Sequence, residues 1–98
     1  MVSRTSSRTM TIAHAEFLRS LSPLKQHYQI EIDEPRREVE ISCRGLRAVL
    51  QLHEMGPVKL GSLTMPSLKV FFRFEDSAVD EISQFWARFD LCFRRGGG

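Results

Sequence analysis

The sequence predicts a small α+β domain in which two helices pack on one face of a four-stranded antiparallel sheet, in the order α-β-β-β-β-α. Three patterns lead to this fold class. Residues 76–95 place large apolar side chains at steps of three or four, as an amphipathic helix does. Residues 27–44 and 68–75 alternate apolar and polar side chains, as strands with one wet face do. A chain of 98 residues is long enough for one hydrophobic core and too short for two.

The N-terminal segment 1–10 reads MVSRTSSRTM and has almost nothing to bury, so we expect a disordered tail ahead of a single domain at 11–95. Met10 directly precedes the first apolar pattern and is an alternative start of translation. Residues 11–21, TIAHAEFLRSL, predict a helix with Thr11 as its N-cap, because the hydroxyl can accept from the free amides of the first turn. Pro23 ends this helix, since the residue before a proline avoids helical geometry.

A hairpin is expected over residues 27–44. Residues 27–33 alternate apolar and polar side chains and predict its first strand. Residues 33–37, DEPRR, form the turn, in which Pro35 supplies a fixed φ. Residues 38–44 alternate again, so the two strands are expected to pair.

Residues 46–55, LRAVLQLHEM, are compatible with two structures. Their apolar side chains alternate, which favours a third strand, but Ala, Leu, Gln and Glu are good helix formers and a helix stays open as the alternative. Residues 56–67, GPVKLGSLTMPS, carry two Gly and two Pro and predict a loop. Its larger apolar residues either tuck under the core or form an exposed patch: Leu60, Leu63 and Met65.

The C-terminal part predicts the last strand and the main helix. Residues 68–75, LKVFFRFE, give the clearest strand pattern, with Phe71 as a large aromatic on the nominally wet face. Asp76 or Ser77 is expected to cap the helix that follows, whose apolar stripe includes Trp86. Gly96 suits the position after a helix end, and residues 96–98 are expected to be a flexible Gly tail.

Composition limits the classes of function. The net charge of +2 and the mixed distribution of charges lack the strong basic balance of an electrostatically driven nucleic-acid binder. No apolar run approaches the roughly 20 residues that cross a bilayer, and no apolar stretch follows the basic N-terminus as in a secretory signal. We therefore expect a cytoplasmic protein with no membrane partner.

No metal site or cofactor is expected. His14, His27 and His53 show no ligand spacing with one another or with the two cysteines, and no phosphate-binding glycine loop is present. Cys43 and Cys92 fall at inward positions of a strand and a helix, where we expect reduced core thiols.

The candidate binding surface is the helix-free face of the predicted sheet around Phe71. An exposed aromatic beside a second apolar residue predicts an interface with another protein or with a second copy of the chain. The alternative is nucleic-acid binding through Lys69, Phe71 and Arg73, because basic and aromatic side chains on a sheet bind single strands. An enzyme with an acid–base pair drawn from Glu31, Glu40 and His53 is the third hypothesis, and no catalytic residue is assigned. The candidate binding residues are Phe71, Lys69, Arg73, Val49 and Arg47.

Two resemblances follow from particular motifs. AEFLRSL, HYQIEID, VFFRF and the closing FWARFDLCFRRGGG resemble a family of small uncharacterised bacterial proteins of about this length, which implies one α+β domain in a bacterial cytoplasm and no assigned activity. The ending RRGGG alone is similar to the Gly-Gly tail of ubiquitin-like modifiers and sulfur carriers. In that family the tail follows a strand, whereas a helix is predicted here, so we interpret the tail as a helix end.

Overall fold

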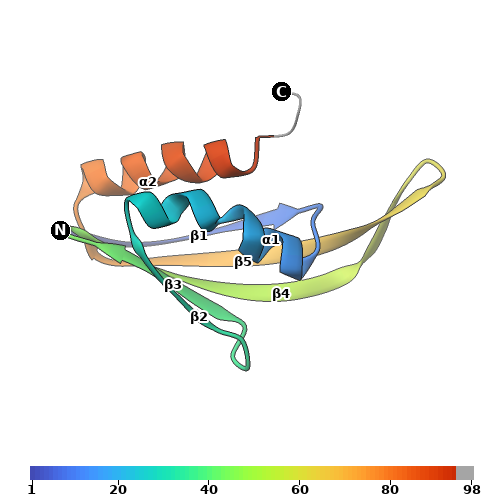
Figure 1. The fold of residues 1–98 in the computed structure, drawn as a ribbon, viewed down its shortest axis with the longest axis horizontal. Helices are drawn as coiled ribbons and strands as arrows, with labels where there is room; N and C mark the ends of the chain where they lie inside the picture. Colours follow the sequence, from blue (N-terminus) through green and yellow to red (C-terminus); the bar gives the residue numbers. More distant parts are fainter. Residues whose placement is uncertain (95–98) are drawn as a thin grey trace.

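The computed structural model describes residues 1–94 and consists of an antiparallel sheet with its helices on one face (Figure 1). The predicted α+β class and antiparallel sheet are confirmed, but the sheet has five strands and not four, because a strand precedes the first helix. Arg95 and the predicted Gly tail at 96–98 lie outside the described residues. The elements are β1 (Val2–Met10), α1 (His14–Ser20), the 3₁₀ helix η1 (Ser22–Gln26), β2 (Gln29–Asp33), β3 (Glu38–Cys43), β4 (Leu46–Leu60), β5 (Leu63–Ser77) and α2 (Val79–Cys92).

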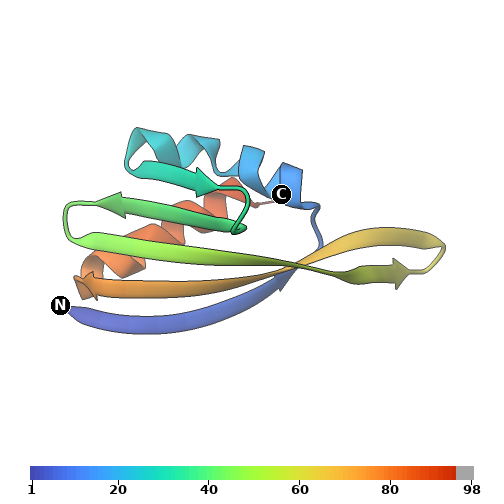
Figure 2. The same cartoon turned by 90° about the horizontal axis from the view of Figure 1, so that it is seen from below.

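The N-terminal segment is the largest departure from the prediction. Residues 2–10 form the edge strand β1, which pairs with β5 from Val2 opposite Ser77 to Met10 opposite Leu68. The sheet order is therefore β1-β5-β4-β3-β2, as Figure 2 shows. The expectation of disorder at 1–10 was wrong because the segment is ordered mainly by backbone pairing, while most of its side chains stay exposed. A search for apolar periodicity cannot detect such a strand.

Arg8 links this edge strand to the C-terminal helix. Its guanidinium lies over the ring of Trp86, with 4.3 Å between Cζ and the ring centroid. It also donates to the carboxylate of Asp90, with 2.5 Å between Nη1 and Oδ1. One polar side chain thus contributes a cation–π contact and an ion pair across the layers.

The core lies between the sheet and the helices, and its largest fully buried side chains are phenylalanines. Phe72 and Phe74 of β5 meet Phe85 and Phe89 of α2, with 5.3 Å between the centroids of Phe72 and Phe89 and 5.5 Å between those of Phe74 and Phe85. Both pairs have the edge-to-face geometry that aromatic rings prefer. Trp86, expected in the apolar stripe, is only partly buried at the margin of this cluster, where Arg8 covers it.

Both helix starts differ from the prediction. The first helix begins at His14 after Ala13 rather than after Thr11, and the last begins at Val79 after Ala78, with no side-chain cap at either start. The residues expected to cap the last helix belong instead to β5. Ser77 is fully buried there, and its hydroxyl accepts a hydrogen bond from the amide of Arg47 at 3.0 Å. Its side chain therefore satisfies a β4 amide rather than a helix amide.

The hairpin predicted at 27–44 is confirmed. β2 and β3 pair in register, with Ile30 opposite Ile41. Arg37 closes the turn in the left-handed region with φ of 52° and donates its amide to the carbonyl of Glu34 at 3.0 Å. Within residues 1–94, neither helix is long and apolar enough to cross a membrane.

The β4–β5 hairpin is much longer than expected. The strand predicted at 46–55 is confirmed. The loop predicted at 56–67 was wrong, because β4 and β5 both continue through this segment to a turn at Gly61. Gly61 has φ of 63°, which a tight hairpin turn requires and glycine adopts without strain. Pro57 lies at a bulge between Met55 and Val58, so the prolines and glycines shape the ribbon rather than end it. The ribbon twists and projects beyond the rest of the sheet (Figures 1 and 2).

Replacing Arg8 by alanine should loosen β1 without unfolding the core. The substitution removes the contacts with Trp86 and Asp90, which together are worth about 1 kcal/mol for partly exposed groups. We expect faster amide hydrogen exchange in β1 and little change in β3. Arg4→Ala is the matched control, because it removes the same type of side chain from the same strand. Equal exchange in the two variants would contradict the linking role of Arg8.

Candidate binding surface on the open sheet face

The side of the sheet opposite the helices is the open face. Alternation defines its members, because Leu50, Leu52, Val70 and Phe72 are fully buried and their neighbours along the strands point the other way. The cross-strand pairs of this face on β4 and β5 are Val49 with Arg73, Gln51 with Phe71 and His53 with Lys69.

Phe71 is the exposed aromatic of this face, with 41% of its surface accessible. The His53 ring meets it edge-on at a centroid distance of 5.4 Å. The ammonium of Lys69 lies 5.2 Å from its centroid. The ring is therefore held by neighbours on both strands and still presents apolar surface to solvent.

A chain of ion pairs covers the neighbouring part of the open face. Arg47 on β4 donates to both carboxylate oxygens of Glu40 on β3, at 3.0 and 3.3 Å, and also pairs with Glu75 on β5. Arg73 donates to the other oxygen of Glu75 at 2.7 Å. Both arginines that were expected to be available for binding thus have carboxylate partners within the molecule.

Val49 does not belong to the accessible surface. It lies opposite Glu40 on one side and Arg73 on the other, and only 5% of its surface is exposed. The prediction that Val49 adds to an exposed apolar patch was wrong, because the long side chains beside it fold over the strand. The open face carries Phe71, Lys69, Arg73 and Arg47, but in two groups. Lys69 lies beside Phe71, whereas Arg47 and Arg73 meet at Glu75 farther along the sheet.

The ion pairs also set the charge state of the face. Hydrogen bonds from Arg47 lower the pKa of the Glu40 carboxyl, since they favour its charged form. Glu40 therefore stays ionised to lower pH than a free carboxyl does. The charges of this region are largely balanced within the protein.

The acid–base group of the third hypothesis is not assembled. Glu31 and Glu40 do lie opposite each other on β2 and β3. Glu40, however, is far from His53. It lies opposite Val49, and Val49 and His53 are four residues, or about 13 Å, apart along β4. Because Glu40 is bound by Arg47 and His53 packs on Phe71, these groups lie beyond the hydrogen-bond reach that proton transfer needs.

A second group of titratable side chains lies where the sheet meets α2. Tyr28 accepts a hydrogen bond from Arg88 at 3.2 Å, and the Cys43 thiol lies 3.9 Å from a carboxylate oxygen of Glu81. Burial raises the pKa of the Cys43 thiol, and the Glu81 carboxylate raises it further. The thiol is therefore mostly protonated at neutral pH, which makes it a poor nucleophile.

The two cysteines are free thiols, as expected, although each is half-buried rather than fully inside the core. Burial raises the pKa of Cys92 as it does that of Cys43. In the described part of the chain, no three side chains of the metal-binding types gather to hold an ion. His14 and His27 belong to no such group in the described residues.

The sequence analysis assigned His53 to an acid–base pair, whereas the structure makes it a neighbour of Phe71 on the open face. A second contributor to the open face was missed from the sequence. Ser7, opposite Phe71 on β1, had no comparable signal, because the segment 1–10 shows no alternation.

Comparison of the chain with models of protein families gives no match, and comparison with curated proteins gives none either. The resemblance to small bacterial proteins therefore stays a prediction that rests on the quoted motifs.

The Glu40–Arg47 pair should stabilise the fold at neutral pH and lose its effect in acid. Because the folded pKa of Glu40 is lowered, the contribution is present above the ordinary carboxyl pKa of 4.5 and disappears as pH falls through the folded value. Glu40→Gln should therefore lower the free energy of unfolding at pH 7, and its difference from wild type should be smaller in acid, at about pH 3. Urea unfolding at the two pH values measures this, and an equal difference at both would contradict it.

The Cys43 thiol should react slowly with iodoacetamide. Its raised pKa reduces the reactive thiolate, so alkylation of Cys43 in the folded chain at pH 8 should be slower than alkylation of a model thiol. Peptide mass analysis after timed quenching separates Cys43 from Cys92. Glu81→Gln should speed the reaction at Cys43 only, because it removes the negative charge beside that thiol. A thiol that reacts as fast as the model compound would show that its environment is misassigned.

Proposed function

We propose that this protein is a small binding module that docks a protein partner on the open sheet face, with Phe71 at the centre of the contact. The observation that carries the proposal is the exposed Phe71 ring, held between His53 and Lys69. A rigid aromatic on a regular strand loses little conformational freedom when a partner covers it. Such side chains supply much of the binding energy in protein interfaces.

The surroundings of Phe71 also match the anatomy of an interface. A typical interface has an apolar centre and a polar rim. Here Gln51 and Ser7 flank Phe71 across the two neighbouring strands, and the ion pairs of Arg47 and Arg73 lie farther along the sheet. A partner that places an apolar side chain on Phe71 and an acidic group near Lys69 complements this surface.

Nucleic-acid binding has less support. Phosphate contacts require basic groups that exchange small counterions for the nucleic acid. Arg47 and Arg73 are already paired with Glu40 and Glu75, so a phosphate would have to displace internal carboxylates. The same carboxylates would repel the phosphate backbone. Phe71 and Lys69 remain as the stacking and charged groups, a smaller set than single-strand binding usually employs.

Phe71→Ala should weaken partner capture without unfolding the chain. The exposed ring contributes little to the core, so we expect a change in stability below about 1 kcal/mol. Binding should weaken by at least about thirtyfold, which corresponds to the loss of a central aromatic contact of roughly 2 kcal/mol. The measurement is quantitative capture from native lysate by tagged wild-type and variant chains, followed by titration with the identified partner.

Ile32→Ala is the matched control, because Ile32 is similarly exposed but lies on β2, at the opposite sheet edge. This variant should retain the partner. Captured material that depends on nuclease-sensitive nucleic acid and falls steeply with salt would replace the proposal by the nucleic-acid alternative. Equal capture by wild type and Phe71→Ala would remove Phe71 from the binding surface.

A further inference from the structure

The projecting end of the β4–β5 hairpin, residues 55–67, forms a two-stranded ribbon that we call the arm. β1 ends opposite Leu68 and β3 ends opposite Gln51, so neither strand accompanies the hairpin into the arm. An isolated two-stranded ribbon is marginal in water. The arm is nevertheless built with large apolar side chains, which would gain stability from a cover.

The apolar residues of the arm share one of its faces. Val58 is directly opposite Met65 and Leu60 is directly opposite Leu63, and paired residues in an antiparallel ribbon point to the same side. Lys59 and Thr64 form the pair between them and therefore point to the other side. Leu60 and Leu63 at the tip are 54% and 62% exposed. The arm thus has one apolar face and one polar face.

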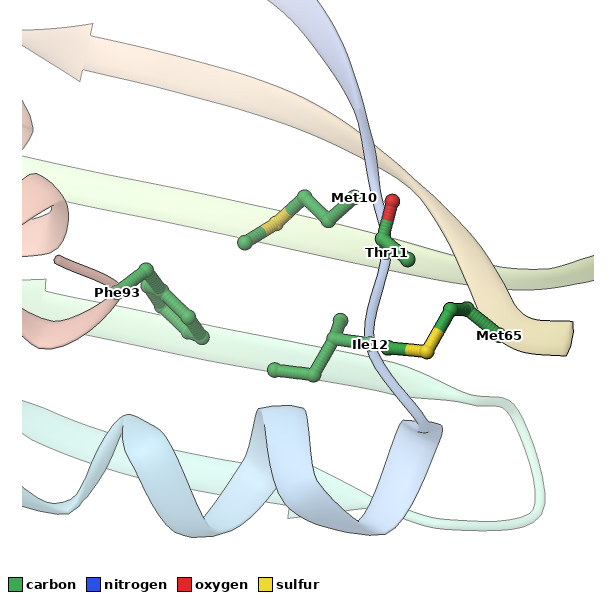
Figure 3. Close-up of a pocket in the computed structure, with 5 residues that line it drawn as sticks. All are labelled: Met10, Thr11, Ile12, Met65 and Phe93. Carbon is green, nitrogen blue, oxygen red and sulfur yellow. The ribbon is translucent and has the colours of Figure 1, made fainter. Parts of the chain in front are cut away.

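An apolar pocket lies at the base of this arm. Its volume is about 350 Å³, and it is lined by Met10, Thr11, Ile12, Met65 and Phe93. Figure 3 shows Met65 reaching from the arm toward Ile12, while Met10 and Phe93 close the other side. Because Met65 belongs to both, the apolar face of the arm continues into the pocket.

We propose that the arm is a self-association element, in which the apolar faces of two arms pack antiparallel and each Leu60–Leu63 tip enters the pocket of the other copy. The geometry is reciprocal, as a two-fold interface requires. Each tip lies five residues, or about 17 Å, beyond the Leu68–Met10 pair at the pocket. When two antiparallel arms overlap by this length, the tip of each arm lies at the pocket of the other copy.

The charge distribution of the arm suits a second copy. Lys59 is the only charged residue between 55 and 67, and it lies on the polar face. Stacking the apolar faces therefore brings no like charges together. The contact on each copy consists of the apolar face of the arm and the rest of the pocket lining: Val58, Leu60, Leu63 and Met65 with Met10, Thr11, Ile12 and Phe93. This is smaller than the roughly 20–30 residues a side of a standard protein interface, so the dimer should form reversibly and at high protein concentration.

The edges of the arm are less suited to association than its face. Pro57 and Pro66 interrupt the amide donors of both strands, and proline on an exposed edge opposes pairing with another strand. Face-to-face packing leaves these edges free. This self-association is independent of the proposed partner site, because Phe71 lies on the body of the sheet.

The test is the mass of the full chain by sedimentation equilibrium over a wide range of protein concentrations. The wild-type chain should approach twice its 11.3 kDa at high concentration. Leu60→Asp combined with Leu63→Asp should raise the dimer dissociation constant by at least about a hundredfold, because charged groups would enter an apolar contact. Both residues are exposed in one copy, so circular dichroism should show an unchanged fold.

Lys59→Asp combined with Thr64→Asp is the matched control, since it adds charge to the opposite face of the same arm. This variant should still dimerise. A wild-type chain that stays monomeric overturns the proposal, and so does a dimer that survives the Leu60 and Leu63 substitutions. A dimer lost only in Phe71→Asp would assign self-association to the open sheet face. A monomer that sediments with phospholipid vesicles through Leu60 and Leu63 would assign the arm to a lipid surface.

Discussion

The packing of α2 against β5 is the interaction on which the rest of the structure depends. β5 is the strand between β1 and β4, and its inward phenylalanines meet those of α2 in edge-to-face contacts. This contact fixes the sheet face on which helices lie. β1 is then attached twice, by its pairing with β5 and by Arg8, which reaches Trp86 and Asp90 on the same helix.

Covering one face of a single sheet leaves the other to be solvated. On the open face, Arg47 and Arg73 pair with Glu40 and Glu75, and their long side chains shield Val49. These ion pairs join β3, β4 and β5 across the solvated face. Phe71 differs from them, because its nearest partners are a ring edge and an ammonium group that leave part of its surface open.

The sequence predicted the elements that bury apolar side chains and missed those held by other means. Alternation located β2, β3, residues 46–55 of β4 and residues 68–75 of β5, and helical spacing located α2. β1 was missed because its order comes from backbone hydrogen bonds with an existing strand, which leave no apolar pattern. Thr11 and Ser77 suit helix caps locally, but the chain path places both outside the helices. Alternation correctly predicted that Phe71 is exposed on the outer side of β5, whereas the burial of Val49 depends on side chains from β3 and β5.

The exposed surfaces follow from unequal strand lengths. In the body of the sheet, alternate residues of β5 are buried under α2, and the intervening residues form the open face with Phe71. Where β1 and β3 end, the β4–β5 ribbon continues with its hydrogen bonding and alternation but without neighbours or helices above it. The apolar residues Leu60 and Leu63 at the end of this ribbon are therefore exposed. Burying this apolar surface would lower the free energy, and only a second molecule can bury it. The ion-paired side chains in the body of the sheet need no such cover.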